Sequence, residues 1–267
     1  MDISLLKSYD YFSALGYRYK MTRKYPFLSV LTIGKSVMGR EIPAFTIGNA
    51  EEYVLFVGGV HGDAHFTSSI LMTFLDELCS KIQEDGVIAG IKVRKALAGK
   101  GIIFVPCLNP DGCEIATHGK SAMGSFEPYL RHLVKNDCND YSHNARGADV
   151  DLAFCASPLR EPESAALYSL CENNTIRHAV VFDKGHSEIF VPEYSQARSS
   201  RLSEILVSST GYNLRLGSGG YESSCFTEWF CRKYSAPAFS VFLNIEKANY
   251  LKLYNSLKEV LMLGSIG

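Results

Sequence analysis

The sequence predicts an α/β protein in which an open, mixed and largely parallel central sheet carries helices on both faces. Strand-like and helix-like segments alternate along the 267 residues, as they do where parallel strands are joined by helices. Two short segments, 102–106 and 179–182, are almost wholly apolar, which is typical of strands in the middle of a sheet that is covered on both sides. In such sheets, binding sites lie at the C-terminal ends of the strands.

The individual elements follow from periodicity. Apolar residues at helical spacing predict helices over 4–19, 66–78, 162–173, 198–209 and 246–262. Short runs rich in apolar residues predict strands at 27–34, 41–48, 53–58, 102–106, 179–182 and 238–243. The segment 113–160 has little periodicity and is expected to form long loops. Neither a repeat nor a linker interrupts the chain, so we expect a single domain over 1–267.

The composition argues against several classes of partner. Hydrophobic residues make up 46% of the chain and the formal net charge is −1, so nothing attracts the protein electrostatically to nucleic acid or to an anionic membrane. The first twenty residues lack the apolar core of a signal peptide, and no apolar run approaches the roughly 20 residues that cross a bilayer. We therefore expect a cytoplasmic protein, whose eight cysteines are reduced thiols.

The segment 57–70 is the most informative part of the chain. The strand predicted at 53–58 runs into Gly58-Gly59, then His61, and then an amphipathic helix. One further motif precedes this segment and four follow it. They are Gly34-x-Ser36-x-x-Gly39-Arg40, Asn109-Pro110-Asp111-Gly112, Asn144-x-Arg146-Gly147, Glu161-Pro162-Glu163, and Trp229-Phe230 with the strand that begins at Pro237. Together these segments, spread from about 25 to 262, resemble the zinc carboxypeptidase family. The details are closest to the branch that cleaves γ-D-glutamyl-diamino-acid bonds in cell-wall peptides.

The resemblance implies a zinc-dependent hydrolysis. In the family, a His, a Glu and a second His hold zinc and leave one position open for water. A glutamate at the end of the last strand takes the proton from that water. An Asn-Arg pair anchors the substrate and polarises the reacting carbonyl.

Most of these roles do not carry over to this sequence. His61 stands at the first histidine, but Ala64 stands at the glutamate ligand and has no atom that can bind a metal. The Asn-Arg pair falls on Asp151 and Leu152, and the general base falls on Phe242. A positioned general base contributes roughly 10²–10⁴ to a rate, so the loss of even one such residue would cripple the family's mechanism.

Two alignments remain open for the second histidine. An ungapped match of Glu188-Ile189-Phe190 to the family's Glu-Ile-Tyr places Asp183 there. A match of His186-Ser187 keeps a histidine but requires a gap at the strand end. We favour Asp183, because the direction of a side chain in a strand depends on register.

The surviving polar residues also have simpler interpretations. We interpret His61 as the hydrogen-bond partner of a neighbouring carboxylate rather than as a metal ligand. His65 is expected to face solvent in the first turn of the helix, and Asp63 to cap that helix.

The remaining candidates are expected to lie in loops. The pair Asp149 and Asp151 is expected in a solvated loop that approaches the former active site. Lys184 and His186 are expected to be exposed loop residues.

Two hypotheses of function follow from the resemblance. In the first, the chain is a pseudoenzyme without a cofactor, whose remnant cleft is partly filled by Leu152 and Phe242 and binds a peptide or small molecule. In the second, it is an active metallopeptidase that cleaves cell-wall-type or C-terminal peptide bonds. Its rebuilt zinc site would use His61 and Asp183, together with His65 or His186.

Overall fold

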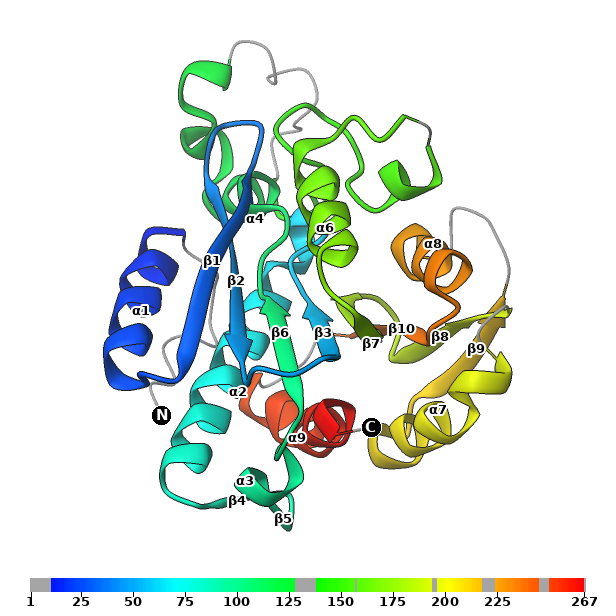
Figure 1. Cartoon of the computed structure of the whole chain (residues 1–267). Coiled ribbons are helices and arrows are strands. Elements are labelled where there is room, and N and C mark those ends of the chain that lie inside the picture. Colours follow the sequence, from blue (N-terminus) through cyan, green and yellow to red (C-terminus); the bar gives the residue numbers. More distant parts are fainter. Residues whose placement is uncertain are drawn as a thin grey trace.

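The computed structural model describes residues 11–127, 138–156, 158–193, 196–217, 224–244 and 250–266. Its centre is an eight-stranded sheet in the order β1-β2-β6-β3-β7-β10-β8-β9 (Figure 1). The strands are β1 (Leu28–Lys35), β2 (Glu41–Ile47), β3 (Tyr53–Val57), β6 (Gly101–Val105), β7 (Ile176–Lys184), β8 (Glu188–Pro192), β9 (Asn213–Gly217) and β10 (Ala238–Leu243). A separate small hairpin pairs β4 (Val87–Ile88) with β5 (Ile91–Lys92).

The sheet is mixed, with parallel strands at its centre. β3 pairs in parallel with β6 and β7, and β7 pairs in parallel with β10. Antiparallel pairing joins β1 to β2, β2 to β6, and β8 to β10. The predicted fold class is thus confirmed, and the C-terminal ends of β3, β7 and β10 meet at one edge.

Helices cover both faces of this sheet. One face carries α1 (Tyr11–Lys24), α2 (His65–Gln83), α7 (Gln196–Thr210) and α9 (Tyr250–Ile266). The other face carries α6 (Pro162–Glu172) and α8 (Cys225–Tyr234). The remaining described helical segments are α3 (Val93–Ala96), α4 (Pro110–His118), and the 3-10 segments η2 (Gly62–Ala64), η3 (Gly119–Phe126) and η4 (Leu152–Cys155).

The apolar central strands bury side chains on both sides, as the sequence predicts. In β3, Val54 and Phe56 lie in the core beneath α2 and α9, whereas Leu55 and Val57 lie in the core beneath α6 and α8. Because successive side chains of a strand point to opposite faces, both faces must be apolar when both are covered.

Several elements differ from the sequence-based expectation. The helix predicted at 66–78 runs from His65 to Gln83, and residues 4–10 of the first predicted helix lie outside the described residues. Strands β8 and β9 and helix α8 were not predicted. The segment 113–160 holds the end of α4 and the segments η3 and η4, so it is not loop throughout. Such short elements are held by tertiary contacts and carry little periodicity of their own.

A disulfide joins Cys155, at the end of η4, to Cys225, in the first turn of α8. The expectation of eight reduced thiols is therefore wrong for this pair. The two cysteines are 70 residues apart in sequence, and only the packing of η4 against α8 brings them together. The other six cysteines are thiols.

A buried polar network joins the loops around the sheet. The carboxylate of Asp111, which is fully buried, accepts hydrogen bonds from the Ser36 hydroxyl at 2.8 Å and the Met38 N–H at 2.8 Å, and pairs with Arg40 at 2.7 Å. The motif Gly34–Arg40 is thereby tied to the start of α4.

A second part of the same network reaches α6. The side-chain amide of Asn144 donates to Glu161 at 2.7 Å and to Glu163 at 3.1 Å. Glu163 also accepts the N–H of Val37 at 3.1 Å. The motifs on which the family resemblance rests are thus largely structural.

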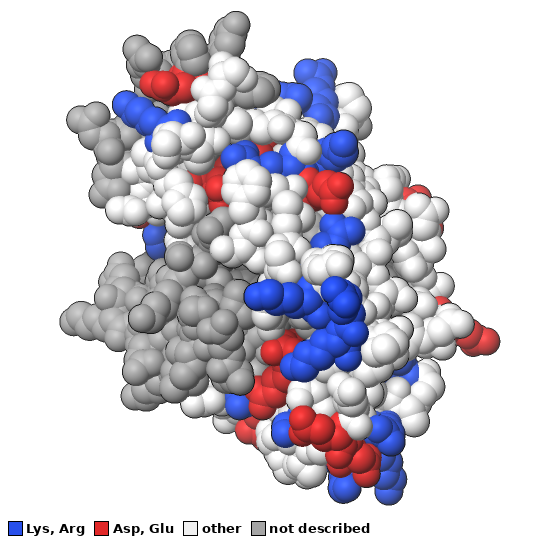
Figure 2. All heavy atoms as spheres, turned by 90° about the vertical axis from the view of Figure 1, so that its left-hand side faces the viewer, with Lys and Arg blue, Asp and Glu red and all other residues white. Residues whose placement is uncertain are grey.

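Charge is unevenly distributed over the surface. Figure 2, which views the α1 side, shows Lys and Arg side chains gathered over α1, whose sequence contains four basic residues and no acidic one. Acidic residues lie below them in the same view. In the described part of the chain, no helix combines the length and the apolar character that crossing a membrane requires.

Candidate functional site

A pocket of about 480 Å³ opens at the C-terminal ends of β7 and β10. His61, Asp151, Leu152, Asp183 and Phe242, all singled out in the sequence, line it. Exposed His186 also lines it. Ala64 is fully buried behind the pocket, and neither it nor His65 is among the lining residues.

Glycines let the chain after β3 deliver His61 into this pocket. Gly59 has a φ of +54°, and a Cβ there would lie 2.5 Å from the Ser68 hydroxyl. A Cβ on Gly62 would lie 2.3 Å from the Tyr141 carbonyl oxygen. Only residues without a side chain can follow this path, so the double glycine and Gly62 determine where His61 points.

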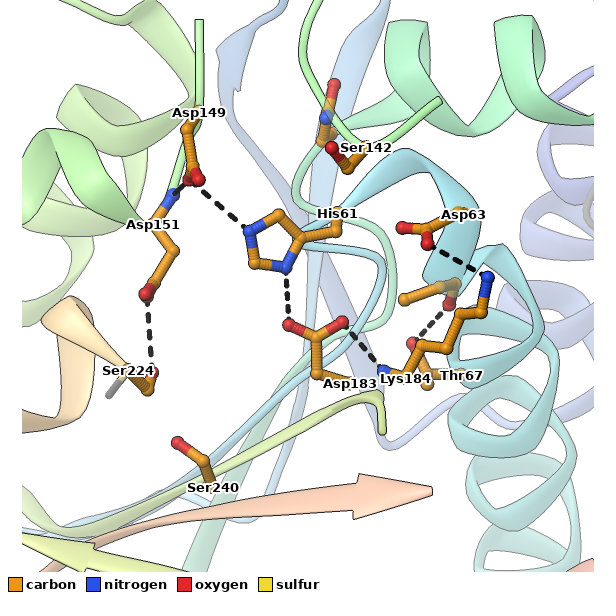
Figure 3. Close-up of polar contacts among 12 residues, drawn as sticks. His61, Asp63, Thr67, Ser142, Asp149, Asp151, Asp183, Lys184, Ser224 and Ser240 are labelled. Carbon is orange, nitrogen blue, oxygen red and sulfur yellow. Dashed lines mark hydrogen bonds and ion pairs between the residues drawn. The ribbon is translucent and has the colours of Figure 1, made fainter. Parts of the chain in front are cut away.

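His61 lies between two carboxylates. Its Nδ1 is 2.5 Å from Asp183 Oδ2, and its Nε2 is 3.3 Å from Asp149 Oδ1 (Figure 3). Burial alone would lower the pKa of His61, but the charge of Asp183 and the hydrogen bonds to both aspartates outweigh it, and the pKa is raised well above its usual value. The two carboxylates thus favour the protonated ring, in which both nitrogens can donate.

Asp149 also organises its own loop. Its Oδ1 accepts the N–H groups of Asp151 and Leu152, each at 2.9 Å. Burial would raise the pKa of Asp149, but His61 and these two N–H groups outweigh it and lower the pKa to about 2. Asp149 thus stays ionised, and it joins the loop before η4 to the histidine.

Asp151 is buried and binds the start of α8. Its carboxylate accepts the N–H of Cys225 at 2.7 Å, the N–H of Phe226 at 3.0 Å and the hydroxyl of Ser224 at 3.2 Å. Burial raises its pKa to about 6. The expectation of a solvated loop is wrong here, because Asp151 caps a helix that is remote in sequence.

Lys184 forms an ion pair with Asp63, the residue that was expected to cap α2. Its ammonium pairs with Asp63 at 3.1 Å and with Asp140 at 3.2 Å. Asp63 therefore does not cap α2, and Lys184, in the last position of β7, is half-buried rather than an exposed loop residue. His65 is also half-buried, and its Nδ1 is shielded from solvent, with no hydrogen-bond partner among the described residues, so the side chain does not face solvent as expected.

Phe242 forms an apolar wall. It pairs with Asp183 on one neighbouring strand and with Glu188 on the other, so its side chain emerges at the pocket edge of β10. A Cβ on Gly185 would lie 2.6 Å from Phe242 Cβ, so glycine there makes room for the ring. Leu152 is 39% exposed and adds a second apolar surface.

Arg215 was missed by the sequence analysis. It lies on β9, pairs with Glu188 at 2.9 Å and lies over the rings of Phe190 at 4.7 Å and Phe242 at 5.6 Å. Because β9 has no clear strand signal, the sequence offers nothing that would place this arginine at the pocket.

The described residues do not offer the family's zinc site. Two ligands on one tetrahedral zinc lie about 3.4 Å apart, from bond lengths of about 2.0–2.2 Å. His61 Nδ1 and Asp183 Oδ2 are only 2.5 Å apart, as hydrogen-bond partners. Ala64 supplies no donor, and Asp149 approaches the opposite nitrogen of the ring. Nowhere in the described segments do three His, Cys, Asp or Glu side chains converge as a metal site requires.

Comparison with known proteins identifies the family. Residues 16–173 match the zinc carboxypeptidase family. The chain belongs to the zinc carboxypeptidase family. Within it, the chain is 24% identical over 266 residues to the γ-D-glutamyl-L-diamino acid endopeptidase 1 of Lysinibacillus sphaericus. That match covers 89% of this chain and 66% of the relative, so the chain spans slightly less than two thirds of the relative's length.

Two solved structures share the fold of this chain. Bovine thrombin-activatable fibrinolysis inhibitor, solved with a tick carboxypeptidase inhibitor, superimposes with a TM-score of 0.75 at 12% identity, over 98% of this chain and 97% of that one. A metallo-carboxypeptidase from Burkholderia cenocepacia superimposes with a TM-score of 0.69 at 15% identity, over 97% of this chain and 68% of that one.

Proposed function

We propose that this zinc carboxypeptidase-fold protein has lost zinc binding and peptidase activity, and that it binds a peptide or small molecule in the pocket around His61. The observation that carries the proposal is the hydrogen-bonding of His61. Both of its ring nitrogens face carboxylates, at 2.5 Å and 3.3 Å. A histidine binds zinc through the lone pair of a neutral ring, and two carboxylates that favour the protonated ring oppose this binding.

Further replacements support the loss of the reaction. Phe242, at the position of the general base, cannot accept a proton. Leu152, at the position of the arginine, cannot hold a carboxylate or polarise a carbonyl. The loss of an oxyanion donor alone costs about 10²–10³ in rate, and the loss of a general base costs roughly 10²–10⁴.

An active metallopeptidase with a rebuilt site is the second candidate. The adjacency of His61 and Asp183 favours it, because aspartate is an accepted zinc ligand. Zinc would have to displace the proton between these two groups and recruit a further donor. The exposed His186 at the pocket rim is the available one, because His65 does not line the pocket.

Two measurements on the purified chain test the proposal. The first is hydrolysis of γ-D-glutamyl-diamino-acid peptides and of ordinary C-terminal peptides in the presence of near-equimolar zinc. The second is the zinc content under the same conditions. We expect no turnover above background and no stoichiometric zinc. Zinc-dependent turnover that disappears in His61→Ala would overturn the proposal.

A rebuilt variant supplies the positive control. It carries Ala64→Glu and Asp183→His for zinc, Asp151→Asn and Leu152→Arg for the substrate, and Phe242→Glu for the base. We expect Ala64→Glu with Asp183→His to gain zinc, and we expect turnover only when all five changes are present.

A further inference from the structure

The cations around the pocket are already paired. Lys184 lies between Asp63 and Asp140, at 3.1 Å and 3.2 Å. Arg215 pairs with Glu188 at 2.9 Å, and its guanidinium is packed against the rings of Phe190 and Phe242. Together with His61, which is held by two aspartates, they leave no unpaired Lys or Arg among the described residues that line the pocket.

Carboxylates outnumber these cations. His61 and Lys184 each contact two carboxylates, and Arg215 contacts one. Among the described residues, a sixth carboxylate, on Asp151, accepts hydrogen bonds from two N–H groups and one hydroxyl. Four of these carboxylates, on Asp149, Asp151, Asp183 and Glu188, line the pocket, and they face three cations when His61 is counted as charged. An excess of negative charge in a partly enclosed site repels anions and attracts cations.

Two carboxylate oxygens at the pocket can accept further hydrogen bonds. The hydrogen bonds of Asp149 all go to Oδ1, and the ion pair of Glu188 goes to Oε1. Within the described chain, no hydrogen bond reaches Asp149 Oδ2 or Glu188 Oε2, and both residues line the pocket. An ionised carboxylate oxygen is a strong acceptor for an ammonium N–H.

The walls beside these acceptors are apolar. Leu152 is 39% exposed, and Phe242 lines the same pocket. An alkyl chain that packed against them would remove apolar surface from water, at about 25 cal/mol per Å². The pocket therefore combines an acceptor for positive charge with a surface for an apolar body.

We propose that the pocket selects ligands that carry a primary ammonium on an apolar body, and that it rejects carboxylates. The ammonium donates to Asp149 and Glu188, and the apolar body lies on Leu152 and Phe242. This inference rests on the proposed ligand-binding function. The family's Asn-Arg pair would hold a negatively charged carboxylate, whereas this pocket would hold a positively charged ammonium.

Three six-carbon probes that differ only in their head group test the proposal. Binding of hexylamine, hexan-1-ol and hexanoate to the full chain is measured by NMR titration at neutral pH. We expect hexylamine to bind at least about 10-fold more tightly than hexan-1-ol, the discrimination typical of a hydrogen bond to a charged group. We expect hexanoate to bind more weakly than the alcohol, and added salt to weaken the binding of hexylamine.

Two variants then test which carboxylates bind the ammonium of hexylamine. Asp149→Asn and Glu188→Gln keep the shape of each side chain and remove its charge, so each should weaken hexylamine about 10-fold and leave hexan-1-ol unchanged. Glu84→Gln, on an exposed residue just beyond α2, is the matched control. The comparison of the three probes on the unmodified chain does not depend on whether the variants fold.

Leucine methylamide carries only an α-ammonium, whereas Nα-acetyl-lysine methylamide carries only a side-chain ammonium. Their relative affinities show whether the pocket prefers the α-ammonium of a peptide N-terminus or the ammonium of a lysine side chain.

Either of two results would overturn the inference. One is hexylamine binding no tighter than hexan-1-ol or hexanoate, which includes no detectable binding of any probe at millimolar concentration. The other is hexylamine binding that neither Asp149→Asn nor Glu188→Gln changes. Turnover is a separate readout: an active enzyme could still prefer amines, and an inactive protein that preferred hexanoate would overturn only this inference.

Discussion

At the scale of single residues, His61 shows how neighbouring carboxylates influence the chemistry of one side chain. Its position after β3 is the position of a zinc ligand in the family. Its neighbours are Asp183 at 2.5 Å and Asp149 at 3.3 Å, and they favour the protonated ring. The same residue type therefore serves as the centre of an ion cluster. The interpretation of His61 as the partner of a carboxylate agrees with this placement.

The titration of His61 tests this description. We expect NMR of the imidazole to show a pKa well above 6.5, the value of a free histidine. Asp149→Asn should lower that pKa, because it removes one of the two charges that raise it. A titration at or below 6.5 in the unmodified chain would contradict the arrangement.

The pKa shifts of His61 and Asp149 make the stability of the protein depend on pH in opposite directions. A raised folded-state pKa means that His61 contributes stability that is fully present below about pH 6.5 and is lost as pH rises through the folded value. Asp149, whose pKa is lowered to about 2, contributes stability above about pH 4 that is lost as the pH falls toward 2. Urea unfolding of His61→Gln and the unmodified chain across pH measures the first contribution.

At the scale of elements, α8 depends on contacts with a segment about seventy residues earlier. Asp151 accepts two of its first N–H groups, and the disulfide Cys155–Cys225 ties the same turn to η4. Leu152 lies between these two links and forms part of the pocket wall. A replacement at the position of the family's asparagine has thus become a structural support for the pocket.

Asp151→Ala tests the role of this cap. We expect the free energy of unfolding to fall by about 1–2 kcal/mol, the usual cost of losing a helix cap. Ser224→Ala, which removes only one donor to the same carboxylate, should cost less. Urea denaturation at pH 7 measures both changes, and an unchanged midpoint for Asp151→Ala would contradict the cap.

The disulfide can be tested by counting thiols. When the protein is unfolded without reductant and alkylated, we expect six cysteines to be modified and Cys155 and Cys225 to remain linked. Reduction before unfolding should lower stability by roughly 2–4 kcal/mol, because the bond closes a long loop in the unfolded chain. Modification of all eight cysteines without reductant would show that the bond is absent.

At the scale of the whole molecule, a buried polar network holds the family's motifs together around the pocket. Asp111, Ser36 and Arg40 join one motif to α4, and Asn144 joins Glu161 and Glu163 at α6. These groups are buried and satisfy one another, so the removal of any member would leave an unpaired polar group. Physical chemistry thus explains why a chain keeps these motifs independently of the residues that line its pocket.

The single domain expected over 1–267 can be tested by unfolding. Trp229, the only tryptophan, packs against Phe154, Tyr168 and Phe226 on one face of the sheet. Its fluorescence reports on that face, whereas far-UV circular dichroism reports on the helices of both faces. We expect the two transitions to coincide. Separate midpoints would indicate two independently unfolding parts.

The sequence by itself determined the fold class and the framework of this protein. Runs such as 53–58 and 102–106 predict strands buried on both faces, and the glycines before His61 allow backbone conformations that other residues avoid. Such local signals arise from side-chain periodicity and backbone sterics, which are properties of neighbouring residues.

Only the tertiary structure decided what surrounds His61. The contacts of Asp151 with α8, of Lys184 with Asp63, and of Arg215 with Glu188 join segments between 27 and 121 residues apart. No local pattern specifies such pairs, because they depend on which strand ends and helix ends meet in space. The charge state of His61 depends in the same way on Asp149 and Asp183, which are 88 and 122 residues away in sequence.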